Sequence, residues 1–171
     1  MSEPTAASPL GRYDTAAADK ELHEVRLLNV PVRLLAAGRE HHDALIQEFS
    51  LLAVAEPAQR EGVPQRMLEL IELLGARYAA AARPDALVDE ALARGDLVID
   101  LTYQVPAHVV DAVDTLGRLM AEADVFCREE RLLTPARSPL IEAFSAWYLS
   151  EFRRQLAGEP PRPWDGALDV S

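Results

Sequence analysis

Two adjacent histidines, His41 and His42, form with Glu40 and Asp43 the densest group of possible metal ligands in the chain. Histidine and carboxylate side chains bind zinc, but one ion needs its ligands close together. Consecutive helical residues point about 100° apart, so these four residues cannot easily share an ion. The pattern favours a packed His42 on the apolar face of a helix beside a solvated His41, and it predicts no metal site.

The single cysteine, Cys127, excludes an internal disulfide and leaves too few thiolates for a metal cage. It falls on an apolar helical stripe, which favours a small core residue. Arg128 and Arg131 lie close by and would favour a reactive thiolate if this helix end were exposed, so a nucleophile is the alternative. The low cysteine content predicts a cytoplasmic location.

The sequence holds no recognisable catalytic motif. It lacks a glycine-rich phosphate loop, a dinucleotide fingerprint, His-Glu-x-x-His and Gly-x-Ser-x-Gly. His23 and His108 have no nucleophile at motif spacing. Carboxylate pairs such as Asp111 and Asp114 are better explained as solvated helix faces. We therefore predict no catalytic residue and no cofactor.

Large aromatic residues gather near the C-terminal end, where Phe144, Trp147, Tyr148 and Phe152 precede Trp164. One apolar stripe needs fewer aromatics, so Trp147 and Trp164 are candidates for a partner surface, where aromatic anchors are favoured. The alternative is that both sides of this helix are buried. The proline-rich segment 160–164 either docks back through Trp164, which we favour, or binds a proline-reading module.

A second hypothesis is a small-molecule sensor or enzyme. Its pocket would lie between a sheet and the helices that cover it. Three residues of suitable chemistry on the predicted apolar faces are candidates for its lining: His42, Tyr103 and Cys127.

Two predicted strands each end in Val-Pro and lead into a long helix. Residues 24–30 alternate between polar and apolar side chains until the pattern slips near Leu27 and Leu28, which indicates a possible bulge. Residues 97–105 give the clearest strand in the chain. Whether the two strands pair directly stays open.

The apolar period becomes helical in five places. The predicted helices follow Pro31, Pro64, Pro84, Pro106 and Ser138. Gly95 should end the third helix, and Ser138 should cap the last one with Pro139 in its first turn. We predict a predominantly helical α+β fold in which two strand-helix units form a small sheet covered by about five helices.

Length and composition favour one acidic domain. The chain has 171 residues, about the size of a single core. Residues 1–20 are rich in small polar residues and should be a flexible arm, residues 21–165 the domain, and residues 166–171 a tail. Lys and Arg number 17 against 28 Asp and Glu, a net charge of −11. Such a field repels nucleic acid and anionic lipid, so we predict neither nucleic acid nor membrane as a partner.

Four segments, residues 24–31, 40–49, 123–128 and 147–152, resemble uncharacterised actinobacterial proteins. In that group the genes tend to lie beside those of anti-sigma-factor kinases and their antagonist domains. The resemblance covers about residues 22–164 and implies an accessory role in partner-switching control of transcription. The opening strand and helix also look similar to the start of an anti-sigma ATPase domain. The asparagine-bearing helix and glycine-rich lid of that family are absent, so the resemblance implies no ATP site.

The leading hypothesis is a non-catalytic cytoplasmic regulatory protein that acts through a protein partner or self-association. It depends on the acidic charge, the missing catalytic motifs, the aromatic C-terminal helix and the resemblance.

Overall fold

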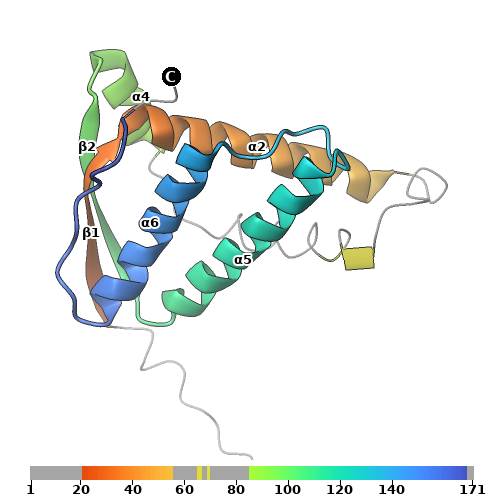
Figure 1. The fold of residues 1–171 in the computed structure, drawn as a ribbon. Coiled ribbons are helices and arrows are strands. Elements are labelled where there is room, and N and C mark those ends of the chain that lie inside the picture. The colour runs from red at the N-terminus through yellow and green to blue at the C-terminus, as the bar shows by residue number, and fades with distance from the viewer. Residues whose placement is uncertain (1–20, 56–64, 67–68, 70–84, 169–171) are drawn as a thin grey trace, which may run out of the picture.

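The computed structural model describes residues 21–55, 65–66, 69 and 85–168. The predicted α+β class is confirmed, because helices predominate and the two strands form a small sheet (Figure 1). The elements are, in order, β1 (Leu22–Pro31), α2 (Val32–Val54), α4 (Asp85–Arg94), β2 (Val98–Pro106), α5 (Val109–Arg128) and α6 (Pro139–Leu156). The predicted arm 1–20 and most of the helix expected after Pro64 lie outside the described residues.

The two strands pair directly, in antiparallel orientation. Val25 lies opposite Tyr103 and Leu27 opposite Leu101, and the register then shifts between Leu27 and Val30. This shift confirms the predicted bulge. Asn29 adopts a left-handed conformation with φ 58°, which asparagine tolerates better than most residues, and its N–H donates to Asp100 Oδ1 at 2.8 Å.

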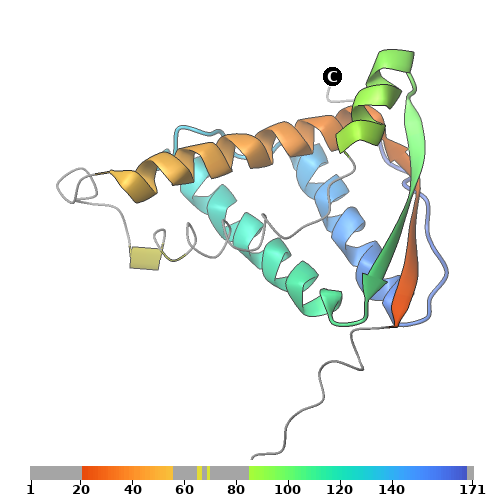
Figure 2. The same cartoon turned by 180° about the vertical axis from the view of Figure 1, so that it is seen from behind.

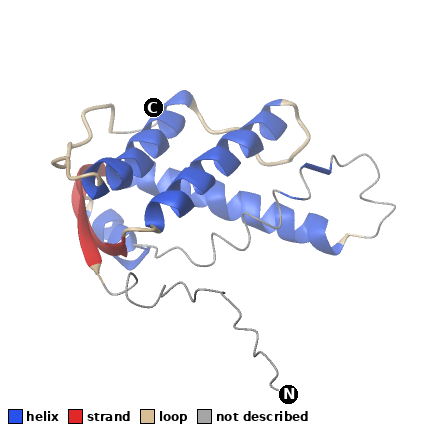
Figure 3. Cartoon of the chain, turned by 90° about the horizontal axis from the view of Figure 1, so that it is seen from below, coloured by secondary structure: helices blue, strands red, loops and turns tan. Residues whose placement is uncertain are grey.

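Alternation along the strands gives the sheet one apolar and one polar face. Val25, Leu27 and Leu101 are buried, whereas Arg26 and Thr102 are exposed. The three long helices lie to one side of this ribbon in all three views (Figures 1, 2 and 3). The apolar core between the sheet and α6 includes Phe144, Phe152 and Trp164.

The sequence signals at helix ends act as predicted. Gly95 has φ 74° and follows α4, and the N–H of Asp96 donates to the carbonyl of Ala91 at 2.9 Å. At the start of α6, the Ser138 hydroxyl accepts the N–H of Ile141 at 3.3 Å, and proline occupies the first turn. These ends fix where α4 stops and where α6 begins.

A second core cluster joins α2 to α5. It comprises Leu45 and Phe49 from α2 with Leu119, Met120, Ala123, Phe126 and Cys127 from α5 and Leu132 beyond it. A third, smaller cluster of Val32, Ala36, Val88 and Ala91 holds α4 against the start of α2. In the described part of the chain, no helix is both long and apolar enough to cross a membrane.

Candidate functional site: the groove between α5 and α6

A groove with a volume of about 790 Å³ lies between α5 and α6. Small residues line it, among them Gly117, Ala121 and Ala146, together with the apolar Leu149. A Cβ atom on Gly117 would lie 3.3 Å from Leu149 Cδ1, so glycine lets the two helices approach closely. The groove therefore has small residues between charged borders.

Two ion pairs cross the groove from one helix to the other. Arg153 of α6 donates from Nε and Nη2 to Asp114 Oδ1 of α5, at 2.9 and 2.5 Å. Arg128 of α5 donates from Nη1 to Glu142 Oε1 of α6 at 3.0 Å. The order of these contacts shows that the helices are antiparallel and that the pairs lie near opposite ends of the groove.

Arg118 also lines the groove, and along α5 it lies between Asp114 and Arg128, the α5 members of the two ion pairs. Its side chain is exposed, and it makes no hydrogen bond or ion pair with any residue that the structure describes. The lining has four arginines, Arg118, Arg128, Arg137 and Arg153, and three carboxylates, Asp114, Asp124 and Glu142, so 4 − 3 = +1. A chain of net charge −11 thus carries a cationic groove in which the guanidinium of Arg118 has no partner among the residues that the structure describes.

A buried ion pair forms one end of the groove. Asp124 of α5 is 1% exposed, and its Oδ2 accepts bonds from Arg137 Nε at 2.8 Å and Nη2 at 2.6 Å. Asp124 Oδ1 accepts the backbone N–H of Arg137 at 3.2 Å. This pairing ties the segment before α6 to α5, because a buried carboxylate needs such donors.

His41 of α2 lies behind this ion pair. Its Nε2 is 3.8 Å from Asp124 Oδ1 and, among the described residues, has no hydrogen-bond partner, while its side chain is only 8% exposed. Burial lowers the pKa of His41; the Asp124 carboxylate opposes this effect and Arg137 adds to it. The expectation of a solvated His41 was wrong, because residues 41, 45 and 49 share the stripe of α2 that faces α5.

Glu48 fixes the loop between α5 and α6 to α2. Its carboxylate accepts the N–H of Leu133 at 2.6 Å, the N–H of Thr134 at 2.8 Å and the Thr134 hydroxyl at 2.7 Å. The Leu133 side chain is 95% exposed on this anchored loop. The loop that carries Arg137 toward Asp124 is therefore held at both ends.

The structure places Trp164 in the core rather than on the predicted partner surface. Its side chain is 7% exposed, its backbone N–H donates to the Leu28 carbonyl at 3.0 Å, and its indole N–H donates to Ala167 O at 3.0 Å. The segment after α6 thus docks back, as the favoured alternative had it. The indole bond reaches Ala167, which lies in the expected tail of residues 166–171.

Trp147, the other aromatic predicted for a partner surface, is half-buried. Its ring lies 5.7 Å from that of Phe144 and 5.5 Å from that of Trp164, measured between centroids. The indole N–H donates to the Arg162 carbonyl at 3.2 Å. Trp147 therefore contacts both its own helix and the returning C-terminal segment.

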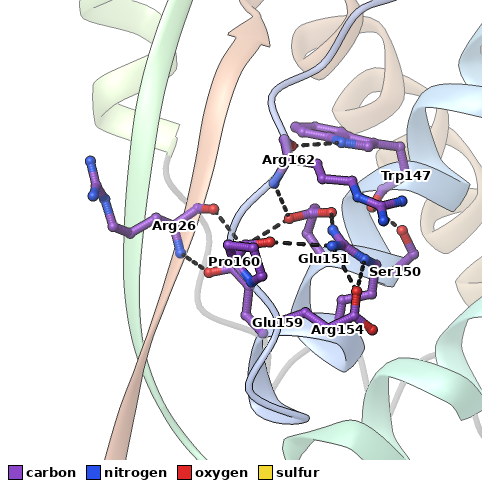
Figure 4. A network of polar contacts seen from close by, with 9 residues as sticks. Arg26, Trp147, Ser150, Glu151, Arg154, Glu159, Pro160 and Arg162 are labelled. Atoms are coloured by element: carbon purple, nitrogen blue, oxygen red, sulfur yellow. Dashed lines mark hydrogen bonds and ion pairs between the residues drawn. The ribbon is translucent and has the colours of Figure 1, made fainter.

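That segment is held by a network around Glu151 (Figure 4). Glu151 is 1% exposed and accepts from Arg154 Nη1, from Gln155 Nε2 at 2.9 Å and from the backbone N–H of Arg162 at 2.9 Å. Gln155 in turn donates to the carbonyl of Arg26 in β1 at 2.7 Å. One buried carboxylate therefore connects α6, the C-terminal segment and the sheet.

The three residues predicted to line a pocket do not lie together. Tyr103 packs in the core between the sheet and α6 and shares a hydrogen bond with the hydroxyl of Tyr148. Cys127 belongs to the α2–α5 cluster, and His42 is half-buried on α2. None of them lines the α5–α6 groove.

The Cys127 thiol is protected by the core. Burial first, and then the nearby carboxylates of Asp124 and Glu48, raise its pKa from 9.0 to about 11. Iodoacetamide should therefore modify native Cys127 far more slowly at pH 8 than the urea-unfolded chain, as measured by mass spectrometry. Because the folded thiol keeps a proton that the unfolded one releases, the thiol's contribution to stability falls as pH rises from 9 to 11. Equal native and unfolded rates at pH 8 would contradict this prediction.

The groove residues were not predicted from the sequence. The predicted apolar stripe of α5 faces the core, whereas the groove also includes the face on which Gly117 and Ala121 are spaced by four. Ser145 and Leu149 of α6 are also spaced by four, as helical neighbours on one face must be. The sequence signal that could have predicted the groove is a stripe of small residues on each of the two helices, bordered by residues of opposite charge.

The geometry thus defines an α+β domain with a charged groove between two antiparallel helices. Comparisons of the chain with family models, curated proteins and solved structures gave no match. Across the described ranges, no three His, Cys, Asp or Glu side chains are grouped so that they could hold a metal ion.

Proposed function

We propose that this chain is a non-catalytic regulatory protein that binds a protein partner in the α5–α6 groove. The partner contributes a helix, and one carboxylate of that helix pairs with Arg118. The observation that carries this proposal is the guanidinium of Arg118, which pairs with no residue of the described ranges, on a groove whose other charges are matched.

The shape of the groove suits a helix. Its lining runs from Val113 to Arg128 on α5, which at 1.5 Å per residue is about 22 Å, or four helical turns. Helices are recognised in grooves of this kind through side chains three or four residues apart. The small residues of the groove would let a third helix approach closely, as ridges pack into grooves.

The charge of the groove selects the partner. An acidic helix is repelled by a chain of net charge −11 unless a local cation compensates. Arg118 supplies that cation without breaking an existing pair, and arginine is enriched among residues that dominate binding energy. The resemblance to proteins encoded beside anti-sigma-factor kinases supports the finer proposal that the partner takes part in partner-switching control of transcription.

Site-specific photo-cross-linking tests the proposal. A photo-reactive residue at Ala146, in the groove, should cross-link one partner in cells, whereas the same residue at exposed Ala143, outside the groove lining, should not. Arg118→Glu should weaken binding of that partner at least about tenfold, and Arg131→Glu, which lies outside the lining, should leave it unchanged. Equal cross-linking from both positions, or insensitivity to Arg118→Glu, would contradict the proposal.

A second candidate function is a sensor of a small anionic molecule in the same groove. The volume of about 790 Å³ falls in the usual range of ligand sites. A thermal-shift screen with carboxylates and nucleotides separates the two. A large shift that Arg118→Glu abolishes would favour the sensor, and the absence of any shift together with the cross-link would favour the protein partner.

A further inference from the structure

The outer edge of β2 has backbone groups that point away from the sheet. Arg26 of β1 turns its N–H and C=O outward to Gln155, at 2.8 and 2.7 Å, so Arg26 and its partner Thr102 do not bond each other. Thr102, and by alternation Gln104, must therefore turn their own N–H and C=O away from β1. These four groups lie on the edge of β2.

The two edges of the sheet differ in how they are covered. The outer edge of β1 is occupied by the Gln155 side chain and by the N–H of Trp164, which donates to the Leu28 carbonyl at 3.0 Å. On β2, the outward backbone groups of Thr102 and Gln104 form no hydrogen bond with the described ranges of the chain. An open edge of this kind is a template for another strand.

The sequence of β2 is self-complementary about Tyr103. In an antiparallel pair centred there, Thr102 lies opposite Gln104 of the partner subunit, and Leu101 opposite the partner's Val105. Polar side chains then face polar ones, apolar face apolar, and Asp100 meets the partner's Pro106, so no like charges are opposed. The apolar residues of both β2 strands would then lie on the same face of the joined sheet.

We propose that two copies of this chain associate through antiparallel pairing of β2 with β2 about a two-fold axis at Tyr103. The pairing joins two two-stranded sheets into one continuous sheet, with two backbone hydrogen bonds for each Thr102–Gln104 pair. Because the contact is short, the dimer is weak and reversible. It uses no residue that lines the α5–α6 groove, so it is independent of the proposed function.

Charge pairs at the two edge positions test both the interface and its register. Thr102→Lys with Gln104→Lys sets lysine opposite lysine in the dimer. Thr102→Glu with Gln104→Lys sets opposite charges across the axis and also places Glu beside Arg26 and Lys beside Glu24 within one copy. Circular dichroism checks that each variant is folded, which is expected because both side chains are exposed.

Analytical ultracentrifugation of the full chain over a concentration series measures the fraction of dimer. The wild type should pass from monomer to dimer, the Lys/Lys variant should dimerise at least about tenfold more weakly, and the Glu/Lys variant should match or exceed the wild type. A monomer at every concentration, or a Lys/Lys variant that dimerises like the wild type, would overturn the proposal. So would a Glu/Lys variant as weak as Lys/Lys, since it would indicate a register that opposes Thr102 to itself.

Discussion

Glu151→Gln should release the C-terminal segment from the domain and lower the free energy of unfolding by about 3 kcal/mol. Glu151 is 1% exposed, and its Oε2 accepts both the Gln155 amide and the Arg162 backbone N–H at 2.9 Å (Figure 4). Glutamine has nearly the same shape as glutamate but no charge. Its NH₂ group would replace one carboxylate oxygen and would face the N–H donors that this oxygen now accepts. Buried donors would then lose their acceptor, which costs more than a surface contact.

Urea unfolding and hydrogen exchange of residues 158–168 measure the effect. Exchange in that segment should rise more than exchange in the α2–α5 core. The reason is that Glu151 accepts the Arg162 N–H of the segment and also the amide of Gln155, which bonds the sheet. Glu159→Gln is the matched control. Glu159 also bonds Arg154, at 2.9 Å, but its side chain is 49% exposed, so its replacement should change stability little. Equal effects of the two variants would show that the network does not hold the segment.

The fold could be predicted largely because its signals are local. The Val-Pro boundaries, Gly95 and the Ser138 cap each depend on the conformation of a few neighbouring residues, and the structure has each where the sequence placed it. The bulge after Leu27 was visible as a slip in a two-residue period. Direct pairing of the two strands was not, because it depends on how the chain between them crosses over.

The residues of the candidate site were harder to predict from the sequence than the helix and strand ends, because their positions depend on tertiary packing. Trp164 follows a proline-rich run that could reach solvent or return to the core, and only the acceptors at Leu28 and Ala167 distinguish the two. His41 and His42 are neighbours in sequence, and a small rotation of α2 decides which one meets Asp124. The groove lies between two helices that approach closely at Gly117, and no periodicity within one helix reveals that approach.

Breaking the buried pair of Asp124 and Arg137 should lower the stability at least as much as Glu151→Gln does. Asp124→Asn leaves the Arg137 guanidinium, whose side chain is 8% exposed, without a carboxylate, so the free energy of unfolding should fall by about 3–5 kcal/mol. The loss should appear as a lower urea midpoint with an unchanged denaturant slope. Loss of this anchor should also open the end of the groove at Arg137.

The double variant Asp124→Leu with Arg137→Met decides why the single change is costly. If the cost comes from an uncompensated buried charge, removing both charges should recover most of the stability, since apolar side chains of similar volume can replace a buried pair. If the double variant is as unstable as Asp124→Asn, the bond from Arg137 N–H to Asp124 Oδ1, at 3.2 Å, must offset the gain from removing both charges, because asparagine can still accept that N–H and leucine cannot. Arg153→Gln, which breaks the exposed pair with Asp114, should change stability little and serves as the surface control.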